Sequence, residues 1–506
     1  MARQEIGAVH VARGASYLLA QGIITNILMA VTFAIIARII TTAEMGAMAV
    51  LMMIIGAARL IACLGMPTSV TRFLAEHLAR EDREKAAGCF YQALRLSFAI
   101  SIPISIALFL LAPFLSLMLL EKPEHMLLLQ ILAIDIVPSA GLIPLLSNAM
   151  LGLQKIRQLS TISIAYNVIR QTLIIFLTII TRSLQGLVVA WLISELVFAS
   201  VLLSCVRRDL GPTSFSFSLK HLVKFSFPLS LQDAVSYVYA WFDRAILLAY
   251  TTLDALGIYN ASMTAFGVLN NVPNAIATSL FPTYSAIQGK NGAEALQSSI
   301  RVASRYVCLI AMPLSHGLAA TAKPALTLFV GEAYAEGTTP LIILSIFFAL
   351  TLVSTALSGL LVVLGETVLS LKLTALNAVI GIGSAQLLLP YLGATGASLT
   401  RGIVMATSLL TAIIALRNRI RLSFDMEAFW KSLLASTVMA IGVAASQTYH
   451  YSKFYLPIYV LIGGAIYLIM LRLTNAIKPE DVHLMEEYLG PRLGPLFKPL
   501  EKYIIA

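Results

Sequence analysis

The sequence predicts an all-α polytopic membrane protein with about 14 transmembrane helices, and three observations predict this class. Hydrophobic residues make up 58% of the 506 residues and charged residues only 12%, whereas charged residues make up about a quarter of an ordinary soluble domain. Apolar stretches of about 20 residues, long enough to cross a bilayer, recur along the whole length. The third observation is an internal repeat, which suggests that the helices form two similar groups.

The repeat is clearest near the ends of two apolar runs, where Thr41-Thr42-Ala43-Glu44-Met45-Gly46 corresponds to Thr251-Thr252-Leu253-Asp254-Ala255-Leu256-Gly257. Further pairs follow at offsets of 210 to 215 residues: Pro67 with Pro282, Gly152 with Gly365, Asn167 with Asn377 and Gly186 with Gly396. Each copy holds six spans, and an even number gives both copies the same orientation. We therefore expect two parallel six-helix lobes, related by an axis along the membrane normal, with the substrate cleft between them.

The hydrophobic pattern predicts where the spans lie. The expected spans are 13–40, 44–66, 88–120, 125–151, 160–181, 184–206, 222–250, 255–281, 301–330, 338–363, 370–389, 392–416, 430–450 and 454–472. Residues 1–210 would form the N-terminal lobe, 211–425 the C-terminal lobe, 426–475 helices 13 and 14 outside the repeat, and 476–506 a cytoplasmic tail. Two stretches in matching places of the copies, 68–87 and 289–300, are predicted to form short amphipathic helices at the membrane surface.

The basic residues argue for a membrane topology rather than for nucleic-acid binding. The net charge is +10, but Lys and Arg gather in alternate loops, as the positive-inside rule requires. This placement predicts a multi-pass protein of the cytoplasmic membrane with both termini in the cytoplasm. No nucleic acid is expected as a partner.

The chain shows none of the motifs that enzymes of several large classes need. No G-x-x-x-x-G-K-[ST] sequence is present for ATP hydrolysis, and no HExxH or Ser/His/Asp set occurs. The four cysteines are scattered without CxxC spacing. The sequence therefore predicts a protein that is not an enzyme and that needs neither a cofactor nor a metal.

One segment resembles a known family. Phe225-Ser226-Phe227-Pro228-Leu229-Ser230, followed by Trp241-Phe242-Asp243-Arg244 and Leu256-Gly257-Ile258-Tyr259-Asn260-Ala261, resembles the seventh-helix signature of polysaccharide biosynthesis flippases. Phe281-Pro282-Thr283 and the stretch from Leu151 to Lys155 also match that Wzx-like family, which belongs to the multidrug/oligosaccharidyl-lipid/polysaccharide (MOP) exporter superfamily. The resemblance implies a MATE/MurJ-like fold and alternating-access flipping of an oligosaccharide linked to a polyprenyl phosphate or diphosphate.

A flippase must carry an anionic headgroup through the bilayer, so arginines inside spans are the first candidates for substrate binding. The candidate cavity cations are Arg59, Arg244, Arg38, Arg170 and Arg401. In the superfamily the first, second, seventh and eighth helices line the central cleft, which favours Arg59, Arg244 and Arg38. The alternative is that each arginine pairs with a buried acid and only fixes helix packing.

Other polar residues inside the spans have further candidate roles. Asp233, Asp135, Glu195 and Asp243 could couple transport to H⁺ or Na⁺, or could form structural salt bridges. Asn270, Asn274 and Tyr237 could contact sugars, or could hold helices together.

Two other functions compete with the flippase hypothesis. A cation or multidrug antiporter of the same superfamily would share the architecture, because fold alone does not fix the substrate. A membrane enzyme acting on lipid-linked glycans would be expected to carry a substantial outer loop, and the predicted outer loops are short. The expected partners are the lipid-linked oligosaccharide and membrane lipids, with glycan assembly enzymes as further candidates.

Overall fold

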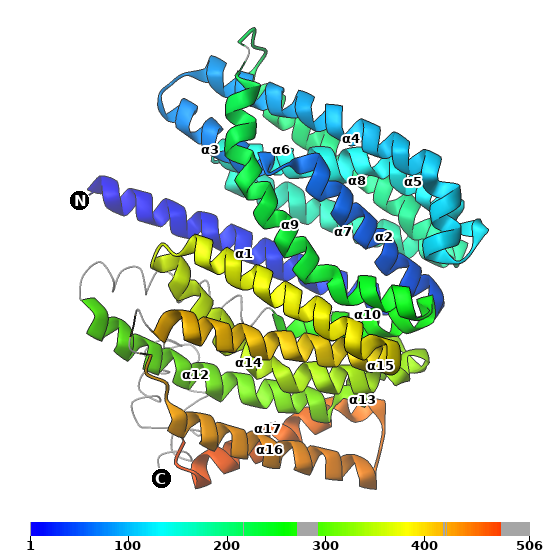
Figure 1. Cartoon of the computed structure of the whole chain (residues 1–506), viewed down its shortest axis with the longest axis vertical. Helices are drawn as coiled ribbons and strands as arrows, with labels where there is room; N and C mark the ends of the chain where they lie inside the picture. The colour runs from blue at the N-terminus through cyan, green and yellow to red at the C-terminus, as the bar shows by residue number, and fades with distance from the viewer. Residues whose placement is uncertain (1, 216, 271–291, 418–419, 421, 477–506) are drawn as a thin grey trace. The chain divides into compact units, whose positions relative to one another are not determined.

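The computed structural model describes residues 2–215, 217–270, 292–417, 420 and 422–476 (Figure 1). All regular elements in these ranges are helices, which confirms the predicted all-α class. By their contacts the residues divide into two compact units, Met1–Ala261 and Ser262–Ala506. This division places the helices at 219–267 largely with the first unit, whereas the predicted lobes meet at residue 210. The lobes of the repeat stay a prediction.

The first unit contains all the helices of the predicted first repeat copy and also α9 and the start of α10. Its elements are α1 (Ala2–Ile36), α2 (Thr42–Cys63), α3 (Met66–Ala79), α4 (Arg83–Leu120), η1 (Pro123–His125), α5 (Met126–Ile136), η2 (Val137–Leu142), α6 (Ile143–Gly152), α7 (Ile156–Thr181), α8 (Leu184–Leu210), α9 (Leu219–Tyr250) and the start of α10 (Leu253–Gly267). Within this unit α5 packs on α4 and α8, α7 packs on α1 and α8, and α9 packs on α2 and α3.

The second unit contains the later helices. They are η3 (Val268–Asn270), α12 (Gly292–Ala320), α13 (Ala322–Val330), η4 (Glu332–Gly337), α14 (Thr338–Val363), α15 (Thr367–Arg417), α16 (Met426–Tyr449), η5 (Lys453–Tyr455) and α17 (Leu456–Leu473). Here α14 packs on α12 and α15, and α16 packs on α12 and α17. Each predicted span coincides with one of the described helices over at least part of its length.

Local sequence signals set the ends of α2. The Thr41 side chain accepts a hydrogen bond from the Glu44 backbone, and the Glu44 carboxylate accepts from the Thr41 backbone at 3.0 Å. This reciprocal pair is a capping box, which satisfies N–H groups that the first helical turn leaves open. Leu64 and Gly65 adopt positive φ angles of 43° and 68° and end the helix. The repeated Thr-Thr-x-Glu/Asp sequence is therefore first of all a helix start.

The fourth predicted span is a broken helix. After α5 the chain widens into the six-residue π-helical turn η2, Val-Pro-Ser-Ala-Gly-Leu, before α6 continues. Pro138 has no N–H to donate, so the regular ladder is interrupted at this place. Carbonyls of the turn find partners on neighbouring helices: Ser97 of α4 donates to Gly141 at 2.8 Å, and Cys63 of α2 donates to Ala140 at 3.2 Å. In a regular helix the Ala140 carbonyl would bond residue 144, which is Pro144 and has no N–H.

The predicted eleventh and twelfth spans form one 51-residue element, α15, with a kink at Gly393. Gly393 has φ 51° and ψ −128°, a conformation that a residue with a Cβ rarely adopts. The first predicted surface helix, 68–87, corresponds in part to α3, Met66–Ala79, while its last residues from Arg83 belong to α4. Its place at the membrane surface stays a prediction. The second is different: from Gly292 onward its residues are the first part of α12, which continues to Ala320, and residues 289–291 lie outside the described part.

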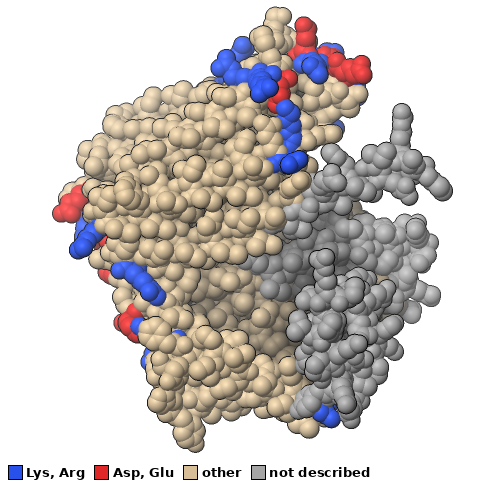
Figure 2. All heavy atoms as spheres, turned by 180° about the vertical axis from the view of Figure 1, so that it is seen from behind, with Lys and Arg blue, Asp and Glu red and all other residues tan. Residues whose placement is uncertain are grey.

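Among the described residues, nine helices are long and apolar enough to cross a membrane. The chain is therefore a multi-pass membrane protein, while the count of fourteen spans stays a prediction. Much of the face in Figure 2 lacks charged residues, and Lys, Arg, Asp and Glu occupy small clusters near its margins.

At the start of α4, Asp82 accepts from the Lys85 backbone, and hydrogen bonding to Lys85 holds the pKa of the Asp82 carboxyl below its usual value.

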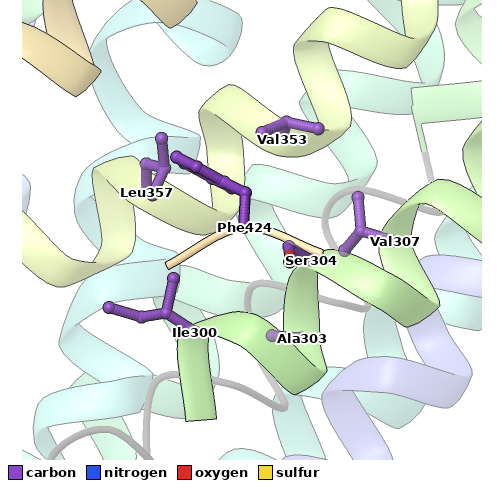
Figure 3. Close-up of a pocket in the computed structure, with 7 residues that line it drawn as sticks. All are labelled: Ile300, Ala303, Ser304, Val307, Val353, Leu357 and Phe424. Atoms are coloured by element: carbon purple, nitrogen blue, oxygen red, sulfur yellow. The ribbon is translucent and has the colours of Figure 1, made fainter. Parts of the chain in front are cut away.

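The second unit contains a small apolar pocket between α12 and α14 (Figure 3). Ile300, Ala303, Ser304 and Val307 from α12, Val353 and Leu357 from α14, and Phe424 line it. Its lining is almost entirely apolar, and several of these residues belong to the hydrophobic core of the unit. The pocket is a packing gap rather than a site for an anionic headgroup.

Candidate functional site

Arg59 and Asp233 lie on two neighbouring helices of the first unit and interact electrostatically. Arg59 lies on α2 and Asp233 on α9, and both side chains are exposed. The charge of Arg59 acts on the Asp233 carboxylate, and Arg59 also interacts with Cys63 one turn further along α2. We call the residues Arg59, Asp233, Tyr237, Trp241 and Arg244 the α2–α9 polar face.

Tyr237 connects the two helices of this face. Its hydroxyl donates a hydrogen bond of 2.7 Å to the backbone carbonyl of Met53 on α2. Its ring lies against Gly56, where an added Cβ would stand 2.7 Å from a ring carbon. A glycine at this position therefore lets α9 approach α2 closely. The observed role of Tyr237 is packing, and a sugar contact stays a prediction.

Arg244 is held at three points. Its Nε donates to the Asn260 side-chain oxygen at 3.1 Å, one terminal nitrogen donates to the Ala240 carbonyl at 3.3 Å, and the guanidinium carbon lies 4.8 Å from the centre of the Trp241 ring. Acceptor and ring together fix the direction of the guanidinium. The side chain stays partly exposed.

The acid next to Arg244 has its own partner. Asp243 is fully buried and accepts a 2.6 Å hydrogen bond from the Tyr259 hydroxyl of α10. It also accepts from the backbone N–H of Arg244 at 3.0 Å. Adjacent residues point to different sides of a helix, so Asp243 faces α10 while Arg244 remains at the surface of α9. Asp243 therefore has a structural contact, and its candidate role in ion coupling stays a prediction.

The structure does not gather all the predicted cations at one point. Asp233, the neighbour of Arg59, is eleven residues before Arg244, which corresponds to roughly 16 Å along a helix. Arg38 is exposed just after α1, and Arg401 is buried in α15 of the second unit. The Asn270 side chain and all of Asn274 lie outside the described residues.

Arg170, Glu195 and Asp135 form a second, buried cluster in the first unit. An Arg170 nitrogen lies 3.2 Å from a Glu195 carboxylate oxygen, which confirms a salt bridge between α7 and α8. Asp135 of α5 is 0% exposed and interacts with both charges. The rings of Tyr166 and Trp191 flank the Arg170 guanidinium at 5.9 and 5.6 Å. We call Asp135, Arg170 and Glu195 the buried charge cluster.

The two copies of the repeated Thr-Thr motif touch each other. An added Cβ on Gly46 would collide with the backbone carbonyl of Leu253, and one on Gly257 would collide with that of Thr42. The Thr42 hydroxyl also donates to the Asp254 carboxylate. Each of the two paired glycines therefore packs against the backbone at the start of the other copy of the motif, and the contact is reciprocal. We call this contact the α2–α10 crossing.

Several of these partners carried no clear signal in the sequence. Asn260 and Tyr259 are part of the family-like motif, but nothing in the pattern shows that they bind Arg244 and Asp243. The glycines of the crossing were visible only as repeated positions. In the described part of the chain, no group of three His, Cys, Asp or Glu residues is arranged to hold a metal ion.

The family relationships agree with the fold. A profile described as "Polysaccharide biosynthesis protein" matches residues 11–288, and one described as "Lipid II flippase MurJ" matches residues 255–469. The chain is 21% identical over 238 residues, 47% of its length and 50% of the relative's, to the "Probable low-salt glycan biosynthesis flippase Agl15" of Haloferax volcanii. The chain spans only half to three fifths of the length of the curated relatives it matches.

Two solved structures share the fold over most of both chains. The "Lipid II flippase MurJ, inward closed conformation" has a TM-score of 0.69 and 15% identity, over 90% of this chain and 97% of that one. An inward-facing multidrug resistance MATE family transporter of the MOP superfamily has a TM-score of 0.63 and 17% identity, over 82% and 95%. The MATE/MurJ-like fold is thus confirmed. Because the first profile covers more than half of its length, the chain belongs to the polysaccharide biosynthesis protein family.

Proposed function

We propose that this protein is a flippase that moves an oligosaccharide linked to a polyprenyl phosphate or diphosphate across the cytoplasmic membrane by alternating access. The observation that carries the proposal is the α2–α9 polar face, which presents the guanidinium groups of Arg59 and Arg244 from helices of a multi-pass chain of this family. A charged side chain inside a membrane span is costly, so its presence there indicates a functional role.

The two arginines suit different parts of such a substrate. A guanidinium is a planar fork that can donate two hydrogen bonds at once to a phosphate. Arg244 is already oriented by Asn260 and Trp241, so little side-chain freedom is lost when it binds an anion. Arg59 stands beside Asp233, whose negative charge would compete with phosphate for it. We therefore assign the first phosphate contact to Arg244 and a second, weaker one to Arg59.

The α2–α10 crossing supports the alternating-access part of the proposal. Close approach at two glycines places small residues where the corresponding helices of the two copies meet. Rocking of two similar halves around a fixed site is the usual mechanism of transporters built from repeats. In this proposal the crossing closes the pathway on the side of the membrane where α2 begins, and it opens to release the glycan.

Further parts of the proposal concern orientation and partners. The alternate basic loops support cytoplasmic termini, which puts the crossing on the outer side. Asp233 and the buried charge cluster are the candidates for coupling to H⁺ or Na⁺. Enzymes that assemble the glycan are candidate partners at the cytoplasmic side.

The test is rescue of surface glycan in a cell that lacks its own flippase. The wild-type chain should restore the glycan. In the Arg59→Ala/Arg244→Ala variant the amount of surface glycan should fall at least tenfold, because a charge-assisted hydrogen bond to phosphate is worth about 1.5–3 kcal/mol. Arg207→Ala/Arg208→Ala removes two exposed arginines at the end of α8 and is the matched control. If the Arg59/Arg244 variant rescues as well as the control, the proposal is wrong.

The antiporter hypothesis keeps one specific observation in its favour. The fold is shared with a multidrug transporter, and two of the three charges in the buried charge cluster are acidic. An antiporter for amphipathic cations would extrude cationic dyes when an ion gradient is imposed, and its activity would not need Arg244. Dye efflux by the purified protein, with no movement of lipid-linked glycan, would favour this function.

A further inference from the structure

The buried charge cluster has an unbalanced charge in a place where charge is costly. It contains two carboxylates and one guanidinium. The salt bridge pairs Arg170 with Glu195, so the negative charge of an ionised Asp135 has no positive charge to balance it within the cluster. Both carboxylate oxygens of Asp135 and the second oxygen of Glu195 are buried and have no hydrogen-bond partner in the described part of the protein. An unpaired buried charge costs several kcal/mol, so the cluster requires one more positive charge or proton.

Among the residues that the structure describes, the surroundings of Asp135 supply no second cation. The ionisable groups that interact with Asp135 are Glu195 on α8, which packs on α5, and Arg170 and Tyr166 on α7. From α2 and α4 come Cys63, Ser97 and Ser101, and the first two bind carbonyls of η2. The Ser139 hydroxyl donates to the backbone carbonyl of Asp135 at 2.6 Å rather than to its carboxylate. His125 and Glu124 of η1 lie beyond the opposite end of α5.

We propose that Asp135 and Glu195 share one proton, with Arg170 neutralising the second negative charge, so that the buried charge cluster is a proton-binding site within the first unit. Binding converts one carboxylate to a carboxylic acid, whose O–H can donate to the other carboxylate. A proton fits better than a metal cation, since only three oxygens of the cluster lack partners, whereas hard cations in proteins take about six oxygen ligands.

The position of Asp135 links the site to the rest of the protein. The π-helical turn η2 begins two residues after Asp135, and π turns inside α-helices are frequent at functional sites. The Ala140 carbonyl of this turn accepts from Cys63, and Cys63 interacts with Arg59 of the α2–α9 polar face. A proton that changes the contacts of Asp135 therefore acts on α2 through η2. This consequence rests on the proposed flippase function, whereas the proton site itself does not.

Trp191 offers a local reporter for the test. It is 4% exposed and packs 5.6 Å from the Arg170 guanidinium, and the chain has only two other tryptophans, Trp241 and Trp430. In the full-length Trp241→Phe/Trp430→Phe protein in lipid nanodiscs, emission should follow a single one-proton transition when pH is varied. Asp135→Asn should abolish that transition. Glu76→Gln, which removes a surface carboxylate on α3, should leave it unchanged.

Two further measurements distinguish proton binding from sodium binding and from a folding defect of Asp135→Asn. Replacing choline by sodium at constant pH should leave the Trp191 emission unchanged, and a sodium-dependent change that Asp135→Asn removes would overturn the assignment to a proton. If the transition keeps its midpoint in Asp135→Asn, the proposal is also wrong. Glu195→Gln is the second variant, and it should shift or abolish the transition even if Asp135→Asn does not fold.

The transport consequence is measured as a ratio of rates. In proteoliposomes the wild type should flip lipid-linked glycan faster with an imposed pH gradient than without it, and in Asp135→Asn this ratio should fall to about one. If the wild type moves no glycan while Trp191 still reports proton binding at Asp135, the flippase proposal fails and the proton site stands. An equal gradient response in both proteins would overturn the coupling role.

Discussion

At the residue scale, Arg170 and Arg244 are held by different kinds of partner. Arg170 and Arg244 are both arginines within apolar helices, yet Arg170 bridges to Glu195 while Arg244 is oriented by Asn260 and Trp241. Periodicity shows which face of a helix is apolar, but it does not show which neighbour that face meets. The different surroundings of the two arginines could therefore be seen only in the structure.

Asn260 should matter because it holds Arg244. Asn260→Ala removes the side-chain acceptor of the Arg244 Nε, so the guanidinium gains freedom that binding must again remove. We expect flipping to fall about three- to tenfold, equivalent to roughly 1 kcal/mol, and less than in Arg244→Ala. Initial rates in proteoliposomes measure both. Asn148→Ala, in α6, is the control, and an equal loss there would show that the effect is general destabilisation.

Tyr259 should matter for stability. Tyr259→Phe removes the hydroxyl that donates to buried Asp243, and a buried acceptor that loses a donor costs about 1–3 kcal/mol. The variant should therefore unfold at a lower temperature in a thermal scan. Tyr391 is 86% exposed, and Tyr391→Phe should unfold like the wild type. Equal stability of the two variants would mean that the Tyr259 hydrogen bond contributes little.

At the element scale, the apolar pattern placed helices well and interruptions poorly. The spans predicted at 160–181 and 184–206 correspond to α7 and α8 with small differences at their ends. The fourth span was expected as one helix, but Pro138 and the π-helical turn break it. A hydropathy pattern does not record backbone hydrogen bonds, so it cannot distinguish a continuous helix from a broken one of the same length.

The α2–α10 crossing illustrates the same limit. The repeat predicted that two similar helix starts exist, while their mutual contact follows from packing of Gly46 and Gly257 against backbone. Gly46→Ala and Gly257→Ala should each force the helices apart and cost about 1–3 kcal/mol, seen as lower unfolding temperatures. Gly267→Ala lies in the same α10, where an added Cβ has no atom of the described residues within 4 Å, and is the matched control. If all three variants behave alike, the crossing is not tightly packed.

At the scale of the whole molecule, composition was sufficient to predict the class. A chain with 58% hydrophobic residues in segments of helical length has few alternatives to a helical bundle in a membrane. The resemblance of the Phe225–Ala261 region to polysaccharide biosynthesis flippases pointed to the family that the profile match confirms. The substrate could not be predicted in this way, because one fold serves both glycan flippases and drug transporters.

The most direct test of the flippase account is movement of the lipid itself. The purified protein would be reconstituted with a fluorescent polyprenyl-diphosphate oligosaccharide, and headgroup exposure would be read from digestion by an added glycosidase. The account predicts that inner-leaflet headgroups become digestible over time only in vesicles that contain the wild-type protein, and far more slowly with Arg59→Ala/Arg244→Ala. If half of the headgroups stay protected in the presence of the protein, while cationic dyes are expelled along an ion gradient, the account is contradicted.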